Sequence, residues 1–200
     1  MKRLFDIIVS IVCLVVLGPL LAAISLAIIM TSGKPAIFIQ TRVGRGKGFI
    51  LLKFRTMKIQ PGAEAGAFEP GSMARTTSVG RVLRATKLDE LPQLWNVLKG
   101  DMSLVGPRPE VPAWVAAYPE RWEHVLSIRP GITDPASLAY RNEESILARY
   151  PNPETAYRET VLPKKLGLYE EYLQKHTLAG DIRIIVETMG KLMSDLLKRK

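Results

Sequence analysis

Two adjacent carboxylates, Asp89 and Glu90, open the motif in the segment TKLDELPQLWNVLKGDMSLVGPRPE, which runs from Thr86 to Glu110. Such a pair at a helix start has two interpretations. Asp is a common N-cap residue, and Glu in the first turn interacts favourably with the helix dipole by about 0.3–1 kcal/mol. A helix start also attracts phosphate, and Mg²⁺ can join one or two carboxylates to phosphate oxygens. The pair therefore suits either helix capping or a magnesium site for a diphosphate ligand.

The same segment ends in the turn GPRP, which presents Arg108 between two prolines. A guanidinium binds phosphate through two parallel hydrogen bonds, and proline restricts the backbone that carries it. Three other cations are further candidate phosphate ligands: Lys53, Arg84 and Arg141. We predict that these cations and the two acids form a site for a phosphorylated substrate.

Composition narrows the classes of partner and of site. The chain has 200 residues, a net charge of +9 and a single cysteine, Cys13. The positive charge favours an anionic partner: a phosphorylated substrate, an anionic membrane surface or nucleic acid. One cysteine excludes internal disulfides and thiolate zinc clusters, and His124 and His176 do not have the spacing of metal ligands.

An uncharged run of 24 residues, IIVSIVCLVVLGPLLAAISLAIIM, extends from Ile7 to Met30. As a helix it would measure about 36 Å, enough to cross a hydrocarbon core of about 30 Å. The run is too long for the apolar region of a cleaved signal peptide. It also argues against a soluble DNA-binding protein, so we expect no nucleic-acid partner.

Gly18-Pro19 falls in the middle of this run, and basic residues flank both of its ends, with Lys2 before it and Lys34 after it. Proline removes a backbone hydrogen bond and bends a helix. Positive charge marks the cytoplasmic side, and here it marks both sides. A helix that enters the membrane, bends at Pro19 and returns to the same face satisfies both observations. A simple span that contains a proline is the alternative.

The elements that must position the candidate site residues begin with a hairpin. Residues 36–57 contain two apolar stretches around the loop GRGKG, which predicts two strands joined by a basic turn, with Lys53 on the second strand. Residues 60–77 are rich in glycine, proline and alanine. This composition predicts a loop that acts either as a lid or as a plain linker.

Helical spacing follows the two acids, with apolar residues predicted on one buried face: Leu91, Leu94, Trp95 and Leu98. This helix would place Asp89 at or near the N-cap, Glu90 in the first turn and Gly100 just past the end. An aromatic stripe with a spacing of four comprises Trp114, Tyr118 and Trp122. Such a stripe belongs either to the core or to a membrane headgroup layer.

The last helix, from about Asp181, carries its apolar residues on one side: Ile182, Ile185, Val186, Met189, Leu192, Met193, Leu196 and Leu197. Packing in the core or in a homodimer is one interpretation of this face. Docking on anionic lipid is the other, because the chain ends in the basic sequence LLKRK. The sequence leaves the two equally open.

Four segments resemble the bacterial sugar transferases: KRLFDIIVS, KFRTM, LDELPQLWNVLKGDMSLVGPRPE and RPGIT. The resemblance covers nearly the whole chain and is to the small monotopic phosphoglycosyl transferases, which include the bacillosamine-phosphate transferase of N-glycan assembly. It implies an α+β fold, mostly helical with a small β-hairpin. It also implies a re-entrant membrane helix over residues 1–34, bent at Pro19, and amphipathic helices at the membrane surface. Residues 35–200 would form a catalytic domain on the cytoplasmic face of the bacterial inner membrane.

The resemblance also implies a reaction. A phospho-sugar would pass from a UDP-sugar to a polyprenol phosphate such as undecaprenyl phosphate, with release of UMP, as the first membrane step of glycoconjugate or exopolysaccharide assembly. By motif match Asp89 is the nucleophile that forms a covalent phospho-sugar intermediate, and Glu90 belongs to the Mg²⁺ site. Inner-leaflet phospholipid is a further expected partner, and a homodimer is compatible with the sequence.

Two alternatives and one departure from the family pattern accompany this interpretation. The chain could be a membrane-anchored basic binding module in which Asp89 only caps a helix, or a transferase that works by a single displacement.

Many family members continue GIT with a glycine and a stretch close to AQVNGRN, whereas this chain has GITDPASLAYRNEE. We expect Arg141 to bind phosphate and residues 134–140 to tune which sugar is accepted.

Overall fold

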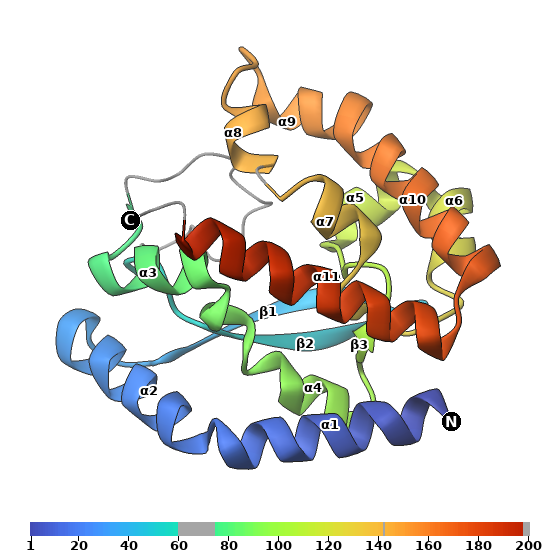
Figure 1. The fold of residues 1–200 in the computed structure, drawn as a ribbon. Helices are drawn as coiled ribbons and strands as arrows, with labels where there is room; N and C mark the ends of the chain where they lie inside the picture. The colour runs from blue at the N-terminus through green and yellow to red at the C-terminus, as the bar shows by residue number, and fades with distance from the viewer. Residues whose placement is uncertain (60–74, 142, 198–200) are drawn as a thin grey trace.

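The computed structural model describes residues 1–59, 75–141 and 143–197 (Figure 1). The fold is α+β and mostly helical with a small antiparallel hairpin, as predicted. Helices α1 (Lys2–Val16) and α2 (Gly18–Ser32) form one edge of the molecule, along the bottom and left of the view in Figure 1.

A bend of 61° separates α1 from α2, and Leu17 is the residue between them. Pro19 lies in the first turn of α2. Its ring lacks the N–H that would bond to the carbonyl of Val15 and crowds that carbonyl, so one straight helix cannot continue through this point. The predicted bend is therefore present. No single helix of the described residues is long and apolar enough to cross a membrane, but the bent pair together has that length and composition.

Polar side chains hold the first turns of α1 against the rest of the protein. The carboxylate of Asp6 is buried and accepts hydrogen bonds from the hydroxyl of Ser103 (2.8 Å) and the backbone N–H of Leu104 (3.3 Å). Lys2 forms an ion pair with Asp181. The other end of the helix pair is held as well, because the buried guanidinium of Arg55 donates to backbone carbonyls at the end of α2.

The predicted hairpin consists of β1 (Ile37–Gly44) and β2 (Lys47–Phe54), which pair in antiparallel register. Arg45 and Gly46 form its two-residue turn, with φ of 49° and 72°. Two successive left-handed residues suit the twist of a hairpin, and glycine adopts this conformation without strain.

The central part of the chain contains, in order, α3 (Ser78–Thr86), the 3₁₀ turn η2 (Leu88–Glu90), α4 (Gln93–Lys99), β3 (Ser103–Val105) and β4 (Gly131–Thr133). β3 and β4 form a parallel pair that the sequence analysis did not predict. The helices beside this centre are α5 (Pro112–Ala117), α6 (Pro119–Val125), α7 (Pro135–Ala139), α8 (Glu143–Leu147), α9 (Pro153–Ala156), the π-helix η3 (Tyr157–Val161), α10 (Leu162–Lys175) and α11 (Leu178–Leu197). The loop predicted over residues 60–77 lies mostly outside the described residues.

The aromatic stripe belongs to the core. Trp114 on α5 and Trp122 on α6 are buried, and Tyr118 packs beside them. The indole N–H of Trp122 donates to the carbonyl of Trp114 (3.1 Å). Of the two interpretations of this stripe, the structure therefore favours the core over the headgroup layer.

The buried face of α4 differs from the prediction. Its buried residues are Gln93, Leu94, Asn96 and Val97. Trp95, predicted to be buried, has an exposed fraction of 54%. The predicted spacing placed the buried residues on a single face, whereas α4 is packed on two sides, by α1 and by β2. These neighbours select the face that is buried.

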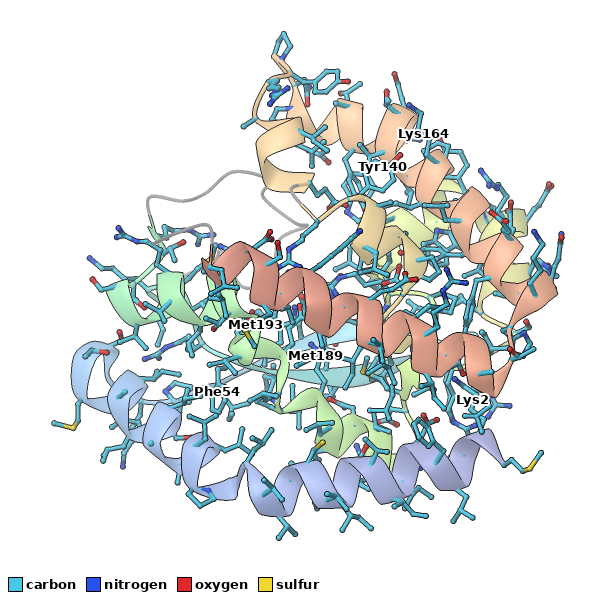
Figure 2. All side chains as sticks on the ribbon, viewed as in Figure 1. Lys2, Phe54, Tyr140, Lys164, Met189 and Met193 are labelled. Atoms are coloured by element: carbon cyan, nitrogen blue, oxygen red, sulfur yellow. The ribbon has the colours of Figure 1, made fainter. Side chains whose placement is uncertain are left out.

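The apolar residues of α11 also divide differently from the prediction. Ile185 packs with Ile184 against the core, but most of the predicted apolar face is exposed: Ile182, Val186, Met189, Met193, Leu196 and Leu197. Met189 and Met193 lie along α11 in Figure 2. A polar contact adds to this packing of α11, since the hydroxyls of Thr188 and Thr133 are 2.7 Å apart. The exposed apolar stripe of α11 is therefore not part of the core.

Candidate functional site

Asp89 and Glu90 lie in the 3₁₀ turn η2, and both are more than nine-tenths buried. The prediction that Asp89 caps the following helix is wrong, because the N-cap of α4 is Pro92 and no side chain caps it. Pro92 has no N–H, and the bonds around it span three residues, such as Trp95 N to Pro92 O (3.1 Å). Neither acid therefore caps α4, although both lie in the first turn of η2, and a first-turn position was the prediction for Glu90.

Two cations converge on Glu90. Its Oε1 lies 2.9 Å from Nζ of Lys53 on β2 and 2.7 Å from Nη2 of Arg108 in the turn after β3. Burial alone would raise the pKa of Glu90, but the charges of Arg108 and Lys53 outweigh burial and hold the pKa well below its ordinary value. Four predicted site residues, Asp89, Glu90, Lys53 and Arg108, thus come together from three separate elements.

The carboxylate of Asp89 differs from that of its neighbour. Its Oδ1 is buried and has no hydrogen-bond partner within the described part of the chain. Burial raises the pKa of Asp89, and the nearby charge of Lys53 offsets this only in part. Buried oxygens without a partner are uncommon in proteins. Within the described residues this oxygen therefore lacks the bond that a buried carboxylate oxygen ordinarily has.

The acidic pair fits a magnesium ion by the chemistry of its donors. Mg²⁺ is commonly bound by one or two protein carboxylates, with substrate phosphates and water completing its shell. Asp89 contributes an unpartnered oxygen, and Glu90 is held ionised by its cations. Among residues 1–59, 75–141 and 143–197, no cluster of three or more His, Cys, Asp or Glu side chains could hold a metal.

The other two predicted phosphate ligands lie on different elements. Arg84 is on α3, where its Nη1 lies 3.5 Å from the hydroxyl of Thr76. Arg141 pairs through Nε with Oδ2 of Asp195 on α11 (2.7 Å) and is not brought to Glu90 as Lys53 and Arg108 are. Nothing in these contacts tests whether either arginine binds phosphate, so both assignments stay predictions.

Residues 134–140, which depart from the family pattern, form the short helix α7 and its two caps. Asp134 is the N-cap of α7, and its carboxylate accepts a hydrogen bond from the backbone N–H of Ser137 (2.8 Å). Burial raises the pKa of Asp134, and the bonds from Ser137 offset part of this effect. The predicted role of residues 134–140 in sugar choice stays untested, and Asn142, directly after Arg141, lies outside the described residues.

The motifs GPRP and RPGIT meet backbone to backbone. Gly106 donates its N–H to the carbonyl of Thr133 (3.1 Å), and Gly131 donates to that of Pro107 (2.9 Å). A Cβ atom added to Gly131 would lie 2.1 Å from the nitrogen of Gly106. Neither position has room for a side chain, and this contact fixes the turn that presents Arg108.

We predict that Gly131→Ala lowers the stability of the protein by about 2 kcal/mol or more, because overpacking against rigid backbone forces the strand pair apart. Thermal unfolding of the purified protein measures this. The matched control is Gly190→Ala on α11, where an added Cβ would have nothing within 4 Å. Gly190→Ala should leave the melting temperature unchanged or slightly raised. Equal melting temperatures for the two variants would contradict the prediction.

Sequence reasoning missed a buried charge network behind this turn. Glu110 accepts a hydrogen bond from the hydroxyl of Tyr157 (2.6 Å) and pairs with Arg42 (3.4 Å). Lys165 lies 3.5 Å from Glu110 and 3.0 Å from Glu143. Burial would raise the pKa of Glu110, but Lys165 and Arg42 together lower it. The one signal in the sequence was Glu110 itself, directly after GPRP.

Comparison with known proteins agrees with the geometry. Residues 1–195 match the family model described as bacterial sugar transferase. The chain is 35% identical over 96% of its length to an Escherichia coli UDP-glucose:undecaprenyl-phosphate glucose-1-phosphate transferase, of which it covers 40%. A Caulobacter vibrioides protein of the same name is also 35% identical, and the chain covers 70% of it. An uncharacterized sugar transferase of Bacillus subtilis, EpsL, is 40% identical, with 87% of its length covered.

The chain thus spans about two-fifths of the length of the Escherichia coli relative and most of the length of the two others. All three matches extend over 96% of this chain, so they take in nearly all of the α1–α2 pair as well as the acidic pair.

Proposed function

The chain belongs to the bacterial sugar transferase family, and from this premise we propose that it moves a phospho-sugar from a UDP-sugar to a polyprenol phosphate and releases UMP. The observation that carries the proposal is the buried, unpartnered oxygen of Asp89 beside a carboxylate that two cations hold ionised. Relatives named as UDP-glucose:undecaprenyl-phosphate transferases support the class of donor and acceptor.

In the first step a carboxylate oxygen of Asp89 attacks the sugar-bearing phosphorus of the UDP-sugar. A new oxygen–phosphorus bond forms as the bond from that phosphorus to the bridging oxygen breaks. UMP leaves with the electron pair of the broken bond. Asp89 then carries the phospho-sugar as an acyl phosphate, which is covalent catalysis by a carboxylate.

In the second step an oxygen of the polyprenol phosphate attacks the same phosphorus. The bond to Asp89 breaks, its electron pair returns to the carboxylate, and the product is a polyprenol-diphosphate-sugar. The attacking group is an ionised carboxylate in the first step and an ionised phosphate oxygen in the second, so neither step requires a general base.

Arg108 and Lys53 are placed to neutralise the phosphate groups. Both belong to rigid elements, the GPRP turn and strand β2, so their charges need no large reorganisation when a diphosphate arrives. Asp89 and Glu90 would hold Mg²⁺, which when bound supplies further positive charge to the phosphate oxygens. Arg84 and Arg141 are proposed as additional phosphate ligands, and at Arg141 the phosphate would share the guanidinium with Asp195, which pairs with its Nε.

A single assay tests the function. Purified protein in detergent or nanodiscs is incubated with Mg²⁺, undecaprenyl phosphate and each of several UDP-sugars, and UMP is measured. We expect UMP with at least one sugar, and none when Mg²⁺ is chelated. A membrane-anchored binding module would release no UMP with any sugar. A single-displacement transferase would release UMP only when both substrates are present, and would form no adduct on Asp89.

We further propose that α1 and α2 form a re-entrant membrane helix and that both ends lie at the cytoplasmic face of the bacterial inner membrane. The support is that both ends contact the same domain. Asp6 binds β3, and Arg55, directly after β2, binds carbonyls at the end of α2. A helix that crossed the membrane would separate its ends by about 30 Å of hydrocarbon and could not keep both sets of contacts.

Single cysteines, one inserted directly after Met1 and one replacing Lys34, in a protein whose Cys13 is replaced, are therefore expected to react from the same side. Both positions are exposed, and neither makes the contacts that hold α1 and α2. Labelling with a membrane-impermeant maleimide, in intact cells and in inverted vesicles, measures this. Both cysteines should react only in inverted vesicles. Reaction of one cysteine in intact cells and of the other in inverted vesicles would establish a span.

The exposed apolar stripe of α11 is proposed to rest on inner-leaflet phospholipid. Helix α1, which is proposed to lie in the membrane, also carries exposed apolar side chains, among them Leu4, Ile8 and Val12. The sequence that follows α11 is basic, which suits anionic headgroups. A homodimer formed through the same stripe is the second candidate, and vesicle binding by a protein that sediments as a monomer favours lipid over dimer.

A further inference from the structure

Two buried side-chain amides on α4 differ sharply in their surroundings. Asn96 is fully engaged with β2, since its Oδ1 accepts from the backbone N–H of Leu52 (3.1 Å) and its Nδ2 donates to the carbonyl of Ile50 (2.6 Å). Gln93 has an exposed fraction of 2%, yet its Nε2 has no hydrogen-bond partner among the described residues. A buried donor without an acceptor costs free energy, so its presence calls for an explanation.

The position of Gln93 places it at the site. Glu90, Gln93 and Asn96 follow one another at intervals of three, which puts them on one side of the η2–α4 unit. The first contacts Lys53 of β2 and the last contacts Leu52 and Ile50 of the same strand. Along the η2–α4 unit Gln93 therefore lies between these two contacts, one turn from the carboxylate that Lys53 and Arg108 contact.

Gln93 also lies one helical turn beyond Asp89. Leu91 and Pro92 have helical backbone angles, so Gln93 follows Asp89 by about one turn of the η2–α4 unit. A donor and an acceptor, Nε2 of Gln93 and Oδ1 of Asp89, are thus one turn apart along the chain, both buried and both without a hydrogen-bond partner among the described residues.

The chemistry of Nε2 of Gln93 restricts the kind of group that can be its hydrogen-bond partner. An amide NH₂ group donates hydrogen bonds and cannot ligate a cation, so its missing partner is an acceptor. With Asp89 as the nucleophile, the phosphorus that bonds to it carries oxygens with negative charge one turn from Gln93. Those oxygens are absent from the free protein and present only with substrate.

We propose that Gln93 is a further catalytic residue, whose side-chain amide donates a hydrogen bond to a non-bridging oxygen of the phosphoryl group as it is transferred to and from Asp89. This inference rests on the proposed function and adds to it a substrate contact at a neutral side chain. The bond is strongest when that oxygen carries most charge, so it stabilises the displacement more than the bound UDP-sugar.

The test replaces Gln93 with methionine, which keeps the length and volume of the side chain and removes the donor. Lipid is omitted, and formation of the phospho-sugar adduct at saturating UDP-sugar and Mg²⁺ is followed by intact-protein mass spectrometry. We expect the rate to fall about 10- to 100-fold, the usual effect of losing a hydrogen bond to a charged group. The melting temperature should stay the same or rise, because an unsatisfied buried donor has been removed.

The matched control is Asn96→Leu, which removes the hydrogen-bonded amide of the same helix. This change leaves the N–H of Leu52 and the carbonyl of Ile50 without their side-chain partner. Its melting temperature should fall by several degrees. Gln93→Glu, which has no donor and adds negative charge beside the phosphoryl group, should be slower than Gln93→Met.

Three outcomes decide the matter. Slow adduct formation with an unchanged or higher melting temperature for Gln93→Met supports the proposal. An adduct rate within twofold of the wild type, or a melting temperature that falls as it does for Asn96→Leu, overturns it and leaves the proposed function intact. If the wild type itself forms no adduct and releases no UMP, the proposed function and this inference fall together.

Discussion

Replacement of Asp89 by asparagine is expected to lower turnover on the order of 10⁴-fold or more, the range seen when a covalent nucleophile is removed. An amide oxygen is a far weaker nucleophile than a carboxylate and cannot form the acyl phosphate. Burial raises the pKa of Asp89, so ionisation of this group opposes folding at neutral pH. The neutral amide removes that cost. The variant should therefore be inactive yet at least as stable as the wild type.

The measurement combines UMP release, adduct mass and thermal unfolding. Wild-type protein with a UDP-sugar and Mg²⁺, without lipid, should gain the mass of one phospho-sugar on the peptide that contains Asp89. The matched control is Asp101→Asn, in the same segment, whose carboxylate pairs with Lys99 (3.2 Å). That control should keep its activity. An active Asp89→Asn enzyme would exclude the covalent mechanism.

Replacement of Arg108 by methionine is expected to lower turnover about 10³-fold, because the site loses a fixed charge aimed at the phosphate groups. The change should also destabilise the fold. Arg108 is one of the two cations that hold the pKa of the buried Glu90 down, and without it the carboxylate keeps only Lys53. Because Glu90 titrates at low pH in the folded protein, this destabilisation should be present at neutral pH and shrink as the pH falls and Glu90 is protonated in the variant.

Loss of activity and loss of stability can be separated by a second change. The double variant Arg108→Met, Glu90→Gln removes the stranded carboxylate together with its partner. It should recover much of the melting temperature and none of the activity, measured by thermal unfolding and UMP release. A double variant that stays as unstable as Arg108→Met would contradict the assignment of the instability to the unpaired Glu90 carboxylate.

Local signals in the sequence determined several elements correctly. The hairpin followed from its two apolar stretches and the basic turn at Arg45 and Gly46, and the helix bend followed from Pro19. Gly100 ends α4 with a left-handed backbone, as its position after the helix predicted. Each of these features depends on residues close together in the chain, whose conformational preferences act wherever the chain is placed.

The grouping of four site residues was also predicted, but on the motifs and not on geometry. Asp89, Glu90, Lys53 and Arg108 were assigned before any contact between them was known, and the structure brings them to one place. Arg141 was assigned in the same way, and its guanidinium is found on Asp195. Residue type indicates what a side chain can bind, whereas only the fold determines which groups lie within reach.

Tertiary structure decided the features that depend on distant partners. The acids lie in a 3₁₀ turn before α4, Trp95 faces outward, and the apolar stripe of α11 is exposed. The parallel pair of β3 and β4 joins segments about thirty residues apart, and the network around Glu110 joins it to Lys165. Which side chains are buried or paired in these places depends on residues far away in the sequence. Those residues contribute free energy only after folding has brought the distant segments together, so local spacing does not predict the contacts.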